Sequence, residues 1–152
     1  MATTFEKTLV IGISATALFD LTDSDKLFEQ EFSKNPHKGM ETYKKHMIEN
    51  EDLPLEEGVG FPLVKALLSL NSYQGNGEKP LVEVVIMSRN SPETGIRVLK
   101  AIRTHDLNIT RSAFTAGESS ADYLDAFEVD LFLTTNQRDA QKVIDSGSCA
   151  SA

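Results

Sequence analysis

Short apolar runs alternate with segments of helical periodicity along most of this chain. Four runs are expected to form buried strands: residues 9–14, 81–88, 112–116 and 129–134. Continuous apolar runs of this length, separated by helices, are typical of a parallel sheet with both faces covered. The pattern therefore predicts an α/β fold of three layers, in which a parallel sheet lies between two layers of helices.

Helical periodicity is clearest at residues 92–104, where apolar side chains recur every three or four positions. Ser91 is the expected N-cap, and Pro92 occupies the first helical position, where its missing N–H has no partner to lose. Residues 61–70 and 136–144 are expected to form two further helices. These helices would separate the strands and cover the sheet.

Residues 20–57 interrupt the alternation, because they are highly charged and contain two helical stretches on either side of residues 35–39. We expect a small helical insertion after the first strand, lying over one end of the sheet. The chain has 152 residues and 40% hydrophobic content, which is enough for one core and too little for two. Residues 1–152 are therefore expected to form a single domain.

Charge and cysteine content exclude several functions. Fifteen Lys and Arg against 23 Asp and Glu give a net charge of −8, which disfavours nucleic acid and anionic membranes as partners. No apolar run approaches the ~18 residues that span a bilayer, and the first residues lack an apolar signal core, so a cytoplasmic location is expected. A single cysteine, Cys149, excludes an internal disulfide and a cysteine-built zinc site.

Hydroxyl side chains follow all four predicted strands. They are Ser14, Thr16, Ser88, Ser120, Thr134 and Thr135. In an open parallel sheet the ligand lies beyond the carboxyl ends of the strands, so we expect these side chains to meet at one site. Arg89, Asn90 and Gly117, which follow the second and third strands, are expected to contribute phosphate or nucleotide contacts there.

Several polar and aromatic positions have a purely structural interpretation. Three residues are expected to be helix N-caps: Ser91, Ser119 and Asn136. For Ser14, Thr16 and Ser88, the residue type leaves capping and ligand binding equally open. The aromatic residues of the insertion are expected to form its small core, with nucleotide stacking as the alternative; they are Phe28, Phe32 and Tyr43.

Six segments carry a resemblance to a known family. They are residues 13–19, 60–67, 85–90, 95–99, 114–117 and 123–127. Their order and spacing, across most of residues 9–147, resemble the cytosolic 5′-nucleotidase I family of the haloacid dehalogenase superfamily. The resemblance implies a Rossmann-like, haloacid-dehalogenase-like sheet and a function in nucleotide metabolism.

Proteins of that family, as the resemblance implies, have two halves of similar fold, and this chain resembles the first. In the second half an Asp-x-Asp motif hydrolyses nucleoside 5′-monophosphates with Mg²⁺: one Asp attacks the phosphorus and the other transfers the proton. The two motif positions hold Ser14 and Thr16 in this chain. The family's phosphate-binding Lys falls near Ser120, and its metal-binding acids fall on Thr134 and Thr135.

These replacements remove the groups that the reaction needs. A serine hydroxyl requires an adjacent base before it attacks phosphorus, and the sequence offers none beside Ser14. Thr16 does not titrate near neutrality, so it does not replace the acid and base. Ser88 keeps the expected residue type, a hydroxyl that donates to a phosphate oxygen. The resemblance therefore implies a catalytically degenerate half that holds no metal or cofactor of its own and packs on a catalytic half.

Two alternatives stay open at the level of sequence. One is a stand-alone module that binds nucleotide or phosphate, or regulates another protein. The other is an active Mg²⁺-dependent phosphatase in which Asp20 is the nucleophile, which requires the first strand to run through Phe19. Residues 146–152 end the chain after a helix, where the family adds a strand. From this we expect either that the sequence is a truncated piece or one part of a split gene, or that a catalytic half or a second copy completes the edge.

Overall fold

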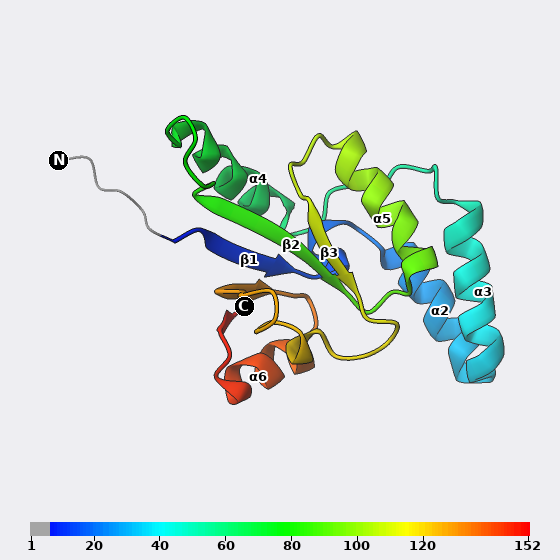
Figure 1. Ribbon diagram of the computed structural model, residues 1–152. Helices are drawn as coiled ribbons and strands as arrows, with labels where there is room; N and C mark the ends of the chain where they lie inside the picture. Colours follow the sequence, from blue (N-terminus) through cyan, green and yellow to red (C-terminus); the bar gives the residue numbers. More distant parts are fainter. Residues whose placement is uncertain (1–6) are drawn as a thin grey trace.

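Five strands form one sheet within residues 7–152, the part of the chain that this computed structural model describes (Figure 1). They are β1 (Leu9–Ile13), β2 (Val82–Ser88), β3 (Arg111–Phe114), β4 (Leu131–Leu133) and β5 (Ala150–Ser151). The strands lie in the order β3-β2-β1-β4-β5, and every neighbouring pair is parallel. The predicted α/β fold with a parallel sheet is confirmed.

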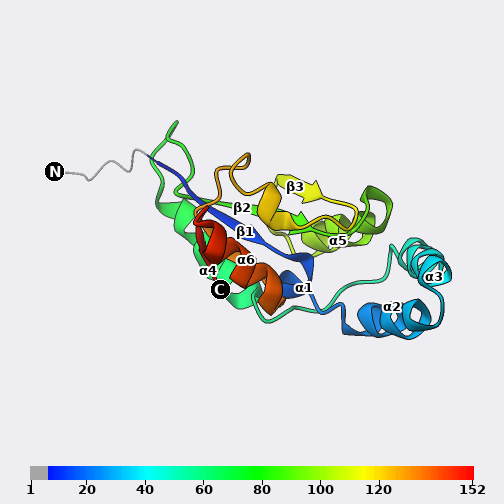
Figure 2. The ribbon, with the colours of Figure 1, turned by 90° about the horizontal axis from the view of Figure 1, so that it is seen from below.

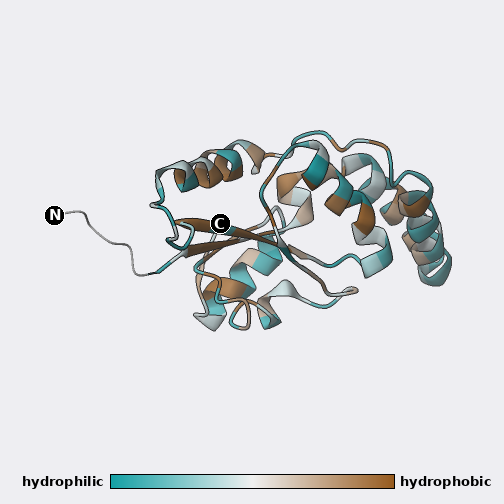
Figure 3. Ribbon diagram, turned by 45° about the horizontal axis from the view of Figure 1, so that its top comes forward, coloured by the Kyte–Doolittle hydropathy of each residue, from teal (hydrophilic) through white to brown (hydrophobic). Residues whose placement is uncertain are grey.

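Helices cover both faces of the sheet. One face carries α1 (Ala15–Leu18), α4 (Phe61–Ser69) and α5 (Pro92–Thr104), and the short 3₁₀ helices η1 (Leu70–Tyr73) and η2 (Ser120–Asp122) follow α4 and β3. The other face carries α6 (Gln137–Ser146). Val84 and Ile86 of β2 point toward α4 and α5, whereas Val85 and Met87 point toward α6. Figure 3 shows the resulting hydrophobic strands between helices that are polar on their outer sides.

The predicted helices are found with small changes at their ends. Residues 92–104 form α5 as expected, and the Ser91 side chain accepts a hydrogen bond at the helix start. The third predicted helix begins one residue late because Asn136 is its N-cap, and it continues to Ser146. Gly147 then ends the helix with a φ of 69°, a conformation that costs glycine little. No helix within residues 7–152 is long and apolar enough to cross a membrane.

Two antiparallel helices lie beyond the carboxyl ends of the strands, and we call them the helical pair. They are α2 (Thr22–Lys34) and α3 (Pro36–Glu49), which lie side by side in both views (Figures 1 and 2). A turn was expected between them at residues 35–39, but Asn35 alone separates them. Its side chain accepts a hydrogen bond from Lys38 N at 3.2 Å, and Pro36 is favoured at the first helical position, so α3 starts at once.

The strand expected at residues 129–134 is confined to Leu131–Leu133. Two further predictions differ from the structure for local reasons. The strand expected to reach Ala116 ends at Phe114, because Ala116 and Gly117 take φ values of 52° and 98° and turn the chain. The expectation that the chain stops before another strand was wrong, since Ala150 and Ser151 pair with β4. Ala150 and Ser151 are small and form no apolar run by which this strand could be recognised from the sequence.

Gly39 sets the close approach of the helical pair and supplies a stability test. A Cβ at this position would lie 2.5 Å from the backbone of Phe32. We expect Gly39→Ala to destabilise the protein, because overpacking costs about 1–3 kcal/mol and exceeds the helix propensity gained, about 1 kcal/mol. Urea unfolding measures the effect. Gly75→Ala is the control, because the new Cβ meets the flexible Glu78 carboxylate, which is free to move away, and we expect its stability to be unchanged. If Gly39→Ala were as stable as this control, the close approach at Gly39 would not matter for stability.

Candidate functional site

A cleft of about 910 Å³ lies between the carboxyl ends of the strands and the helical pair. This volume is within the usual range for small-molecule sites. The strand side is lined by Ser14, Thr16, Ser88, Arg89, Asn90, Gly117, Ser120, Thr134 and Asp139, and the helical side by Asp25, Phe28, Phe32, Met40 and Tyr43 among others. Five of the six predicted hydroxyl residues therefore line one place, which we call the strand-end cleft; the sixth, Thr135, is outside its lining and contacts Thr16.

Three hydroxyl groups form a chain from β1 to β4. The Ser14 and Thr16 oxygens lie 3.2 Å apart, and Thr16 Oγ1 lies 2.8 Å from Thr135 Oγ1. Ser14 is also the N-cap of α1, because its Oγ accepts a hydrogen bond from Ala17 N at 3.2 Å. Capping and exposure to the cleft thus coexist at Ser14. These contacts join neutral hydroxyls to one another and to backbone, and none of them supplies a base.

Hydrogen bonds hold the loop after β2 in place. Ser88 is 5% exposed, and its Oγ accepts a hydrogen bond from Asn90 N at 3.2 Å. The Asn90 side chain accepts one from the Tyr43 hydroxyl at 2.9 Å, which ties the loop to α3. Gly117 N donates to Arg89 O at 2.7 Å. Since that N–H is already used, Gly117 would assist a ligand by its lack of a side chain.

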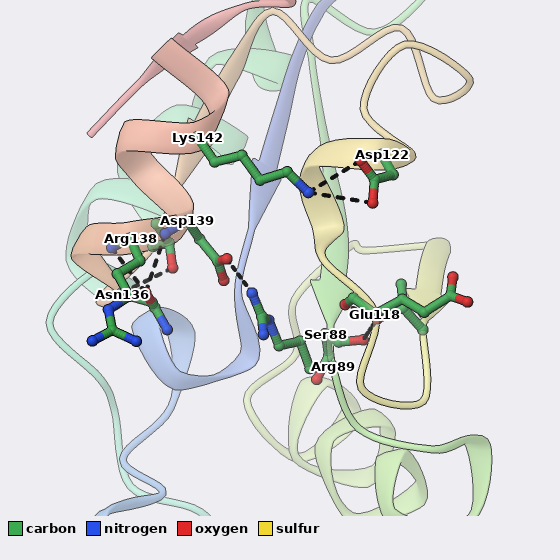
Figure 4. Close-up of polar contacts among 10 residues, drawn as sticks. Ser88, Arg89, Glu118, Asp122, Asn136, Arg138, Asp139 and Lys142 are labelled. Atoms are coloured by element: carbon green, nitrogen blue, oxygen red, sulfur yellow. Dashed lines mark hydrogen bonds and ion pairs between the residues drawn. The ribbon is translucent and has the colours of Figure 1, made fainter. Parts of the chain in front are cut away.

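Arg89 forms an ion pair with Asp139, a residue that the sequence analysis did not single out. Figure 4 shows the two side chains pointing toward each other, one from the loop after β2 and one from the first turn of α6. Asp139 is 6% exposed, whereas the Arg89 side chain is 47% exposed. The available signal was an acid in the first turn of a helix that follows a strand, a position that the helix dipole favours. Arg89 is thus held in the cleft wall.

The strand ends do not fit Mg²⁺. This ion prefers an octahedral set of oxygens that includes one or two carboxylates, but Ser14, Thr16, Thr134 and Thr135 offer neutral hydroxyls. The Asp139 carboxylate beside them is paired with arginine. Within residues 7–152 there is no group of three His, Cys, Asp or Glu side chains that could hold a metal ion. We therefore assign no chemical step to a metal in this cleft.

The aromatic residues of the helical pair serve both as packing and as a wall of the cleft. Phe28 contacts Phe32 with ring centroids 4.9 Å apart and Tyr43 edge-on at 5.4 Å. Phe32 is 40% exposed, and the neighbouring Met40 is 52% exposed. The predicted small core is present, and its exposed edge offers an aromatic surface to a ligand.

Asp25 lies at this aromatic wall with its side chain half-buried in the cleft. Burial, followed by the negative charges of Glu29 and Asp20, raises the pKa of its carboxyl to about 6. Burial and the nearby Asp25 charge also raise the pKa of Tyr43 to about 12, so its hydroxyl stays protonated and donates to Asn90. The ionised form of Asp25 therefore lowers the stability of the folded protein.

Asp20 lies outside the strand-end cleft. β1 ends at Ile13 and does not run through Phe19, as the alternative with an Asp20 nucleophile required. The Asp20 carboxylate instead accepts a hydrogen bond from Thr22 N at 2.9 Å, at the start of α2, and the side chain and then the backbone of Thr22 lower the pKa of Asp20. It lines a separate cavity of about 310 Å³ together with Arg97 and other residues.

The N-cap predictions had mixed outcomes. Ser91 and Asn136 accept hydrogen bonds from helix N–H groups, as expected. The prediction for Ser119 was wrong, because its side chain makes no cap hydrogen bond, and its buried Oγ has no partner within residues 7–152. A 3₁₀ turn of three residues follows Ser119, so it presents fewer free N–H groups than an α-helix. Ser120 beside it is buried at the edge of the cleft.

The raised pKa of Asp25 gives a test of stability against pH. Because the pKa of Asp25 is about 6 in the folded state and ordinarily 3.8, the folded state binds the proton more tightly. Stability therefore falls as pH rises between these values, and the cost is complete at neutral pH. We expect Asp25→Asn to stabilise the protein at pH 7 by about 1 kcal/mol, which is the full shift reduced for a half-exposed group.

Urea unfolding above and below this interval measures the effect, and the difference between wild type and Asp25→Asn should disappear in acid. Asp23→Asn is the matched control, because Asp23 lies in the same helical turn but is exposed. A constant difference between wild type and Asp25→Asn at all pH values would contradict the assignment.

Comparison with known proteins gives the chain a family. The model of a family described as 5′-nucleotidase matches residues 1–152. The chain is 30% identical over 142 residues to human cytosolic 5′-nucleotidase 1B, a match that covers 91% of this chain and 22% of the relative. No solved structure matches the chain. The resemblance in motif order and the parallel sheet agree with these matches, and the chain therefore belongs to the 5′-nucleotidase family and fits its cytosolic 5′-nucleotidase I members.

Proposed function

We propose that this chain binds a nucleoside 5′-monophosphate or phosphate in the strand-end cleft and does not hydrolyse it. The observation that carries the proposal is the polarity of the cleft, with hydroxyl and guanidinium donors on the strand side and aromatic side chains on the other. A phosphate requires the first kind of surface, and a nucleobase packs on the second. Membership of the 5′-nucleotidase family supports the same class of ligand.

The phosphate end of the ligand would lie at the hydroxyl chain and Arg89. Arg89 lines the cleft, and a guanidinium has five N–H donors, so those that Asp139 does not engage are left for a ligand. Ser14 and Thr16 add hydroxyls that turn to donate to a phosphate oxygen. Ser88 is buried, and its Oγ is hydrogen-bonded to Asn90 N of the loop after β2. Its role in the site is therefore to hold that loop in place.

Hydrolysis would require groups that this cleft lacks at the expected positions. Ser14 has hydroxyl and backbone neighbours, so nothing activates it as a nucleophile. Thr16 is bonded to Thr135 and does not exchange a proton near neutrality. Ser120 and Thr134 supply neither the lysine nor the metal-binding carboxylate of the family reaction, and Arg89 is already paired with Asp139, so the charge that develops on the phosphoryl group has little compensation. Binding without turnover is the activity that these residues support.

A second function is support of a catalytic half. The chain spans 22% of the length of the human relative, and it carries hydroxyls where the chemistry of the family requires carboxylates. We propose that it packs on a catalytic half, in the same polypeptide or as a separate chain, or on a second copy of itself. The relative's name, cytosolic 5′-nucleotidase 1B, supports a cytoplasmic location for that assembly.

Binding in the cleft is tested by NMR. We expect AMP and inorganic phosphate, without Mg²⁺, to shift the amide signals of Ser14, Ser88 and Gly117. Thr16→Val should weaken binding about threefold to tenfold, because it removes one hydrogen-bonding hydroxyl. Thr104→Val is the matched control, since Thr104 donates to Lys100 O on α5, away from the cleft.

Two results would contradict the binding proposal. The first is a set of amide signals that phosphate and AMP leave unchanged. The second is release of phosphate from AMP or IMP with Mg²⁺, abolished by Asp20→Asn, which would identify a hydrolase with its nucleophile outside the strand-end cleft.

Association is tested by light scattering after size exclusion. We expect this chain, mixed with a separately produced catalytic half of a longer family member, to elute as a complex with the summed mass. Each component alone at the same concentration is the control. A strict monomer in both the presence and the absence of the catalytic half would remove the second function.

A further inference from the structure

Asp25 is the charged group that the proposed contacts leave unused. Its carboxylate lines the strand-end cleft and has no hydrogen bond or ion pair with any residue in 7–152. The other deeply placed acid of the cleft, Asp139, is neutralised by Arg89. A half-buried carboxylate without a partner carries a desolvation cost. Such a group is well suited to accept hydrogen bonds from a ligand.

Helix formation does not explain this acid. An acidic side chain in the first turn stabilises a helix through the dipole, but Asp23 occupies the same turn of α2 and is exposed to solvent. The Asp20 side chain already accepts a hydrogen bond from Thr22 N at the helix start. The carboxylate of Asp25 therefore lowers the stability of the folded protein and is not needed to begin α2.

Asp25 lies on the aromatic side of the cleft, where the nucleoside part of a ligand would bind. Phe28 follows it by three residues, so the two side chains share one face of the helix. Tyr43 contacts Phe28 edge-on and lies close enough to Asp25 for its pKa to respond to that charge. A nucleoside packed on this aromatic wall would bring one of its edges to the carboxylate, while its phosphate reached the strand ends.

An ionised carboxylate accepts hydrogen bonds and donates none, and its two oxygens match two adjacent donors. A nucleoside offers such a pair in two places: the 2′- and 3′-hydroxyls of ribose, and the N1–H and N2–H edge of guanine. Resting on the proposed function, we propose that Asp25 is a specificity-determining residue that binds one of these adjacent donor pairs on a nucleoside 5′-monophosphate.

Calorimetric titration of the full chain at about pH 7.5, where the carboxyl is ionised, distinguishes the two sources. AMP against dAMP isolates the ribose diol, and dGMP against dAMP isolates the guanine edge. We expect one comparison to show about tenfold tighter binding than dAMP, because hydrogen bonds to a charged acceptor are strong. Asp25→Asn should abolish that preference, and the control Asp23→Asn should keep it.

Inorganic phosphate, titrated in parallel, separates failure of this role from failure of the proposed function. Phosphate should bind wild type and Asp25→Asn equally, which also shows that the variant is folded. Equal affinity of wild type for AMP, dAMP and dGMP, or a preference that survives in Asp25→Asn, would overturn the role of Asp25 alone. If neither phosphate nor AMP binds the wild type, the proposed function fails and the role of Asp25 fails with it.

Discussion

Parallel pairing of β1 with β2 on one side and with β4 on the other determines where the polar turns of this chain lie. Ile13 pairs with Ile86 and with Leu133, so these three strands end at nearly the same level. Parallel strands bring their carboxyl ends to one edge of a sheet. The turns that follow then place their polar residues together, although these turns lie far apart in sequence. The strand-end cleft is a direct product of this register.

The opposite wall depends on contacts that are local to the helical pair. Asn35 starts α3 immediately after α2, and Gly39 lets the two backbones approach closely. The aromatic side chains of the pair then contact one another on the side that lines the cleft; they are Phe28, Phe32 and Tyr43. The bond between the Tyr43 hydroxyl and the loop after β2 joins this wall to the sheet. The sheet and the helical pair thus enclose one cleft.

The sequence was sufficient to predict the parts of the fold that repeat a strong pattern. Buried runs such as β2 and a capped amphipathic helix such as α5 have signals within a few residues. β5 has no such signal, because it consists of two small residues that offer no apolar pattern. Asp139 and Asp25 were missed for another reason: their importance arises from burial and from their neighbours, Arg89 in one case and an aromatic wall in the other. Those neighbours are distant in sequence.

The hydroxyl chain at the strand ends has a consequence for how this protein folds. Acidic side chains at the ends of β1 and β4 would repel one another unless a cation compensated their charge. Ser14, Thr16 and Thr135 instead satisfy one another as neutral groups. The contacts that join β1 to β4 at this edge of the sheet are therefore hydrogen bonds between uncharged groups, which need no counter-ion to form.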